Sequence, residues 1–246
     1  LLVLLHMDEE ERLHSRIIEL TPEISFRFSN YWSVVGGRRK QRPDVRMPFH
    51  HISGDGLASP LDKDGAPSPS RAVTTHTQLS DAFAEGIYDA NWRDSARRLL
   101  VKEYFRPAEQ VALREMLGLS SRDDEEISGH SLEEADKQEE MRAKGRDAKF
   151  RQVVVSAYDF TCALTGHRLI TITAGSLVEA AHIKPIASRG SNEIGNGLAL
   201  TRNAHWAFDA GLWSADDDFK VIVAKDKFHE TLLPEACAYE LKHMEG

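Results

Sequence analysis

The sequence has few cysteines, no long apolar run and no overall basic charge. The two cysteines, Cys162 and Cys237, are too few for a four-cysteine zinc site and argue against a disulfide framework. This usage fits a reducing cytosol, so we expect a cytoplasmic protein. Residues 1–5 are apolar but too short for a signal-peptide core or a membrane span, so we expect no membrane partner. The chain does not begin with methionine, so Met7 is a candidate start, but we interpret residues 1–5 as the first turn of a helix.

The net charge of -8 at first argues against an anionic partner, so its location matters. Nine acidic residues and one basic residue lie between Asp123 and Glu140. The chain totals are 39 acidic and 31 basic residues, so the rest holds 30 of each and is neutral. Because the acidity belongs to one segment, the sequence is compatible with an anionic ligand elsewhere.

The acidic segment also suggests how the chain is divided. It has few large apolar residues and could not build a core of its own. Ser131 and Glu134 have the spacing of a helix capping box, so we predict a solvated helix here. We therefore predict an α+β protein with an N-terminal α+β domain (1–118), an acidic helical linker (119–148) and a C-terminal domain (149–246).

The N-terminal part carries helix and strand signals. Apolar spacing predicts a helix over 8–20, and alternating aromatic and β-branched residues predict that at least part of 24–35 is strand. Three further helices are predicted over 79–88, 91–104 and 107–117, the last closed by Gly118. In the second of them, Arg93, Arg97 and Arg98 should form the solvent-facing side.

The C-terminal part carries the residues with chemical potential. After a predicted helix over 146–158, the order is a strand ending at His182, a polar loop with Asn196, a short strand, and a short helix that Asn203 could cap. His205 and Asp209 are four residues apart on that helix, so they share a face and can bind one cation. Asn196 could also be a turn residue with positive φ between two glycines, and both roles can hold together.

The segment VEAAHIKPIASRGSNEIGNGLALTRNAHWAFDAGLWSADDDFKV resembles the HNH nucleases found in predicted bacterial restriction endonucleases, over about 160–223. The resemblance implies a ββα-metal nuclease domain in which His182 is the general base, since an imidazole suits proton transfer at neutral pH. It implies that His205 and Asp209 bind one divalent ion (Mg, Mn, Ni or Zn). Asn196 would tie the loop to the hairpin and hold the His182 ring, and the products would carry 5′-phosphate and 3′-hydroxyl ends.

One position departs from the family pattern. Many HNH sites have a metal-binding Asp or His immediately before the base, where this sequence has Ala181. Glu179 lies two residues earlier on the same strand, and alternate strand residues project to one face. Either Glu179 or water would supply the missing ligand.

The N-terminal segment FRFSNYWSVVGGRRKQRPDVRMPFHHISGDGL resembles the N-terminal region of the same endonucleases. In some relatives a comparable Pro-Phe segment belongs to a domain that reads phosphorothioate-modified DNA. Basic residues beside aromatics suit phosphate contact, and Met47 with the next two residues could form an apolar pocket for sulfur. Many relatives have an aromatic where Ala58 stands. The predicted DNA contacts are Arg38, Arg39, Lys40, Arg42, Arg46, Pro48 and Phe49.

These features predict a metal-dependent endonuclease that hydrolyses phosphodiester bonds in double-stranded DNA. A restriction role is expected, with modified DNA as one substrate option, and double-strand cutting would favour a homodimer. Two alternatives stay open. One is an inactive protein that only binds modified DNA, because Ala181 has cost it the metal. The other is a nuclease toxin with little sequence preference, against which the substantial N-terminal part argues.

Overall fold

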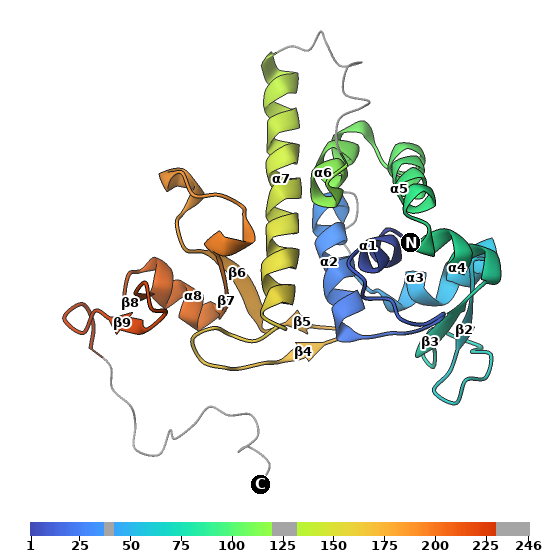
Figure 1. Ribbon diagram of the computed structural model, residues 1–246, viewed down its shortest axis with the longest axis horizontal. Helices are drawn as coiled ribbons and strands as arrows, with labels where there is room; N and C mark the ends of the chain where they lie inside the picture. Colours follow the sequence, from blue (N-terminus) through green and yellow to red (C-terminus); the bar gives the residue numbers. More distant parts are fainter. Residues whose placement is uncertain (37–41, 120–131, 230–246) are drawn as a thin grey trace.

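The computed structural model describes residues 1–36, 42–119 and 132–229, and it is an α+β fold (Figure 1). A long helix, α7, stands between the N-terminal helices on one side and the last four strands of the chain on the other (Figure 1). The N-terminal part contains α1 (Leu2–Glu9), β1 (Ile17–Glu19), α2 (Pro22–Val35), α3 (Arg46–His51), β2 (Ala58–Leu61), β3 (His76–Leu79), α4 (Asp81–Tyr88), α5 (Ala90–Tyr104) and α6 (Pro107–Leu117). The C-terminal part contains α7 (Leu132–Ala157), β4 (Ile170–Thr171), β5 (Gly175–Ser176), β6 (Val178–His182), β7 (Gly197–Thr201), α8 (Arg202–Asp209), β8 (Trp213–Ala215) and β9 (Val221–Val223).

The strand predicted within 24–35 is wrong, because this segment is the helix α2. Thr21 caps the helix by accepting a hydrogen bond from the Ile24 backbone, and proline occupies the first turn. Its buried positions follow a helical spacing that overrides the local alternation. They include Ile24, Arg27, Tyr31 and Val34.

The helix predicted over 8–20 is also wrong. Residues 1–5 lie at the start of α1 as expected, but α1 ends at Glu9. Ile17–Glu19 forms β1, which pairs antiparallel with β3 in a sheet ordered β1-β3-β2. Pairing with a distant strand is not visible in local apolar spacing. The predicted helices over 79–88, 91–104 and 107–117 are confirmed as α4, α5 and α6, and Gly118 closes α6 in the left-handed conformation.

The helix α7 serves two hydrophobic cores. Ala148 packs into the N-terminal core, whereas Phe150, Val154 and Val155 belong to the C-terminal core. A Cβ at Gly145 would lie 2.2 Å from the Ala112 carbonyl oxygen, so the absence of a side chain allows α6 and α7 to touch. The second part of the predicted linker is therefore part of α7, which packs against α6. Residues 120–131 of the predicted linker lie outside the described residues. The division at 148/149 stays a prediction, and one continuous helix crosses it.

A buried polar network ties α1 to α2, α5 and α7. His6 Nδ1 lies 2.8 Å from the Tyr31 hydroxyl and 3.2 Å from Gln152 Nε2 of α7. Arg97 is 4% exposed and pairs with Glu9, so its predicted place on the wet side of α5 is wrong. A buried charge is costly without an opposite charge beside it, so the ion pair between Arg97 and Glu9 holds α1 against α5.

His6 makes the protein less stable in mild acid. Burial lowers the pKa of His6 from 6.5 to about 4. Between these two pH values the unfolded chain binds a proton at His6 that the folded chain does not bind. The free energy of unfolding that is present above pH 6.5 is therefore lost as the pH falls, by about 3 kcal/mol in total. Urea unfolding between pH 7 and pH 5 should show this slope, and His6→Gln should remove its share. Equal slopes in the two proteins would contradict the assignment.

Within the described ranges, no helix combines the length and the apolar character that a membrane crossing requires.

Candidate functional site

The predicted hairpin and helix are present. Strands β6 and β7 pair antiparallel, with Glu179 opposite Leu200 and His182 opposite Gly197. Helix α8 follows β7 directly, and the Thr201 side chain caps it by accepting from Ala204, in place of the predicted cap Asn203. This arrangement places α8 against β6, with His205 of the helix next to Glu179 of the strand.

His205 lies between two carboxylates. Its Nδ1 is 2.9 Å from Glu179 Oε1, and its Nε2 is 3.4 Å from Asp209 Oδ2. Arg202 is also near, with Nε 3.8 Å from Glu179 Oε2. The structure therefore brings Glu179, His205 and Asp209 together, with the two carboxylates at different nitrogen atoms of the His205 ring.

This geometry separates the roles of the two carboxylates. A carboxylate accepts the Nδ1 proton of His205, which leaves the lone pair on Nε2, facing Asp209. Metal-binding histidines commonly have such a carboxylate on the nitrogen that does not bind the metal. Ala181 is 1% exposed and packs in the C-terminal core, so this position offers no ligand.

The donor set fits a divalent cation. Two donors about 2.1 Å from one ion at a near-tetrahedral angle lie roughly 3.4 Å apart, which matches the separation of Nε2 and Asp209. No cluster of three or more His, Cys, Asp or Glu side chains suited to a metal occurs in the part of the chain that the structure describes. A cation here would have two protein ligands, and water or phosphate oxygens would complete its shell.

His182 is held by residues that the sequence did not single out for this role. Its ring stacks on Phe150 of α7, with centroids 4.0 Å apart and planes 4° from parallel. Its Nε2 lies 2.8 Å from Asn192 Oδ1, so Nε2 carries the proton and Nδ1 presents a lone pair. A Cβ at Gly197 would lie 3.0 Å from the Phe150 ring and 2.3 Å from Val154, so only glycine admits α7 this closely.

Asn196 braces the loop rather than the His182 ring. Its side chain donates to the carbonyls of Lys184 and Ser191, at 2.9 and 2.8 Å, and accepts from the Lys184 backbone at 2.8 Å. The predicted tie between loop and hairpin is thus present, but Asn192 contacts the ring. The predicted positive φ is wrong, because Asn196 ends a short 3-10 helix. Two asparagines in one polar loop were the only sequence signal for this division of roles.

The predicted N-terminal DNA contacts fall into three groups. Arg38, Arg39 and Lys40 lie outside the described residues. Arg42 and Pro48 are exposed, and Arg46 is exposed but forms a bidentate pair with Asp44 at 2.9 and 3.0 Å. Phe49 is 6% exposed in the N-terminal core, so it packs inward rather than forming the expected sulfur pocket.

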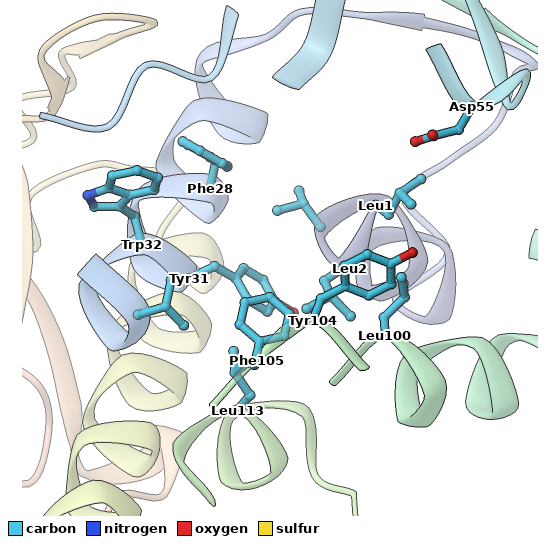
Figure 2. A pocket seen from close by; sticks show the side chains of 12 residues that line it. Leu1, Leu2, Phe28, Tyr31, Trp32, Asp55, Leu100, Tyr104, Phe105 and Leu113 are labelled. Carbon is cyan, nitrogen blue, oxygen red and sulfur yellow. The ribbon is translucent and has the colours of Figure 1, made fainter. Parts of the chain in front are cut away.

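A different apolar pocket, of about 440 Å³, lies in the N-terminal part (Figure 2). Tyr31, Trp32, Tyr104 and Phe105 supply aromatic walls from α2 and from the end of α5, and Asp55 is the one acid among its lining residues (Figure 2). None of the predicted DNA contacts lines it. The pocket shares no lining residue with the His205 cluster. Two of its aromatic residues, Tyr31 and Trp32, belong to the N-terminal segment whose basic and aromatic residues were predicted to contact DNA.

Comparison with known proteins bears on the C-terminal part. Residues 162–216 match the family model described as HNH endonuclease. No curated protein and no solved structure matches the chain. The match spans β4 to the start of the β8–β9 turn, including Glu179, His182 and His205. It supports a nuclease, an enzyme that hydrolyses phosphodiester bonds with DNA as its substrate.

Proposed function

We propose that this nuclease, which carries an HNH endonuclease domain at residues 162–216, cleaves double-stranded DNA with His182 as base and one divalent cation at His205 and Asp209. The observation that carries the proposal is the His205 ring, fixed by Glu179 on one nitrogen and facing Asp209 with the other. A hairpin that supplies a base and a helix that supplies ligands suit hydrolysis of a phosphodiester.

In this proposal His182 takes a proton from the attacking water through Nδ1. The Asn192 amide fixes the tautomer by accepting from Nε2, and the Phe150 ring fixes the plane of the imidazole. A base held in one orientation loses little freedom on reaching the transition state. Asn196 contributes indirectly, because it braces the loop that carries Asn192.

Glu179 is proposed to orient His205 rather than to bind the ion. In this proposal a water molecule takes the place of the ligand that is missing at Ala181. When bound, the cation would stabilise charge on the phosphorus centre and the leaving 3′ oxygen. The products would carry 5′-phosphate and 3′-hydroxyl ends.

A restriction-type role, with the N-terminal part recognising DNA that can be modified, belongs to the same proposal. Arg42 and Pro48 are exposed there, as contact residues must be. Double-strand cutting with one active site in each chain would favour a homodimer. The alternative, a reader without activity, draws on one observation, the buried Ala181 at the usual ligand position.

Cleavage of supercoiled plasmid tests metal dependence. We expect nicking or linearisation with Mg²⁺, Mn²⁺, Ni²⁺ or Zn²⁺, none with a chelator, and recovery when metal is restored. The reason is that the carboxylates of Glu179 and Asp209 are anionic, so only a bound cation can stabilise negative charge on the leaving oxygen. Gel electrophoresis measures conversion, and ligation of the products reports 5′-phosphate ends.

Two outcomes would contradict the proposal. Undiminished cleavage in the presence of chelator would show that cleavage does not depend on a metal ion. Tight DNA binding without cleavage in any metal would favour the alternative of an inactive DNA-binding protein. Phosphorothioate-modified and unmodified plasmids run in parallel would show whether modification is recognised.

A further inference from the structure

A cleft of about 520 Å³ adjoins Glu179 and is built from both halves of the chain. Its walls come from α2, the segment before α3, helix α7, the β4–β5 hairpin with the start of β6, and the first residue of α8. The hairpin is fastened to α2, because the Ser25 hydroxyl donates to the Ile172 carbonyl. One wall of the cleft is therefore tied to the N-terminal part, and the cleft lies beside the proposed catalytic centre.

The charges that line this cleft are mostly positive. Three arginines, Arg42, Arg151 and Arg202, face one carboxylate, Glu179, which His205 already engages. Arg42 and Arg151 are both exposed, and neither has an ion-pair partner within residues 1–36, 42–119 and 132–229. Most other arginines in the described residues have a carboxylate partner, as Arg27, Arg93 and Arg97 do. Two arginines without such a partner in one cleft are therefore unusual for this chain.

A buried donor accompanies these charges. Asn30 of α2 lines the cleft and is 3% exposed, yet its Nδ2 has no hydrogen-bond partner among the described residues. Buried polar groups are normally satisfied, so this amide donor at the wall of the cleft is open to an acceptor that a ligand would bring. Guanidinium groups and an amide N–H are all donors, and the oxygens of a phosphodiester are all acceptors.

We propose that this cleft binds the backbone phosphates of one DNA strand next to the bond that is cut. The inference rests on the proposed function and adds where the substrate lies. Arg42 and Asn30 belong to the N-terminal part and Arg202 to the HNH part, so one strand would contact both. The N-terminal part then positions the scissile phosphate in addition to any role in reading modification.

Salt-dependent binding tests the cleft. Fluorescence anisotropy with a labelled duplex, in chelator so that nothing is cut, gives Kd from about 50 to about 200 mM salt. Arg42→Gln and Arg151→Gln should each weaken binding about fivefold to tenfold and lower the slope of log Kd against log salt by about one, as the loss of one phosphate contact predicts. Arg151→Lys should keep most of the slope, because it keeps the charge.

Lys102→Gln is the matched control, since it removes one exposed positive charge from α5, and Lys102 does not line the cleft. Helix α5 lies on the opposite side of α7 from β6 and α8 (Figure 1). It should leave Kd and slope unchanged. Wild-type Kd and slope in both arginine variants would overturn the proposal, as would an equal loss in Lys102→Gln or a wild-type chain that does not bind DNA. If the wild type binds but cuts nothing in any metal, the proposed function fails while the binding series still decides the cleft.

Discussion

Replacement of His182 by alanine is expected to slow DNA cleavage by about 10²–10⁴-fold, the usual contribution of a positioned general base. The ring stacks on Phe150 and presents Nδ1, so it is the one imidazole on β6 ready to accept a proton. DNA affinity measured in chelator should not change, because the ring forms no part of the arginine cleft. The loss should therefore fall on kcat and leave KM largely intact.

Two further variants separate catalysis from folding. His182→Asn keeps a planar polar side chain without a usable base, so it should be as slow as alanine. Asn192→Ala leaves the base in place but frees its ring, so we expect a smaller loss and a changed pH profile. Thermal unfolding checks that Phe150 still packs. Cleavage by His182→Ala at the wild-type rate would assign the base to another residue.

How far the sequence leads depends on the range of the interactions. His182, Asn196, His205 and Asp209 could be placed on a strand, a loop and a helix because their spacing encodes the local elements, and β6, β7 and α8 have the predicted order. The partner of the His182 ring could not be found this way. Phe150 comes from a helix thirty-two residues earlier and reaches the ring because Gly197 has no side chain.

The N-terminal part shows the opposite difficulty. The segment 24–35 carries both a strand-like alternation and a helix-like spacing, and the surrounding helices decide in favour of α2. Phe49 lies in a segment whose composition suggested DNA recognition, but its side chain packs in the core. Asn30 and Arg151 were not predicted as functional residues, yet both line one cleft. Residues from α2 and α7 become neighbours only through tertiary packing, which no local pattern records.

Replacement of His205 by alanine should also lower cleavage by about a thousandfold, because the cation supplies several kcal/mol and each 1.36 kcal/mol is a factor of ten. Added metal should not restore the rate, since Asp209 alone cannot hold the ion in place. Calorimetric titration with Mn²⁺ should show the metal site lost. Asn203→Ala, an exposed change on the same helix, is the control and should behave as wild type.

Glu179→Gln then distinguishes an orienting residue from a ligand. The amide oxygen can still accept the Nδ1 proton of His205, so an orienting role predicts metal affinity lowered about tenfold to a hundredfold and a rate largely recovered at high metal. A ligand role predicts a rate that stays low at every concentration, as with His205→Ala. Recovery would mean that a β6 strand with alanine before its histidine can still support a metal nuclease, because the helix supplies the protein ligands and the strand only holds one of them in place.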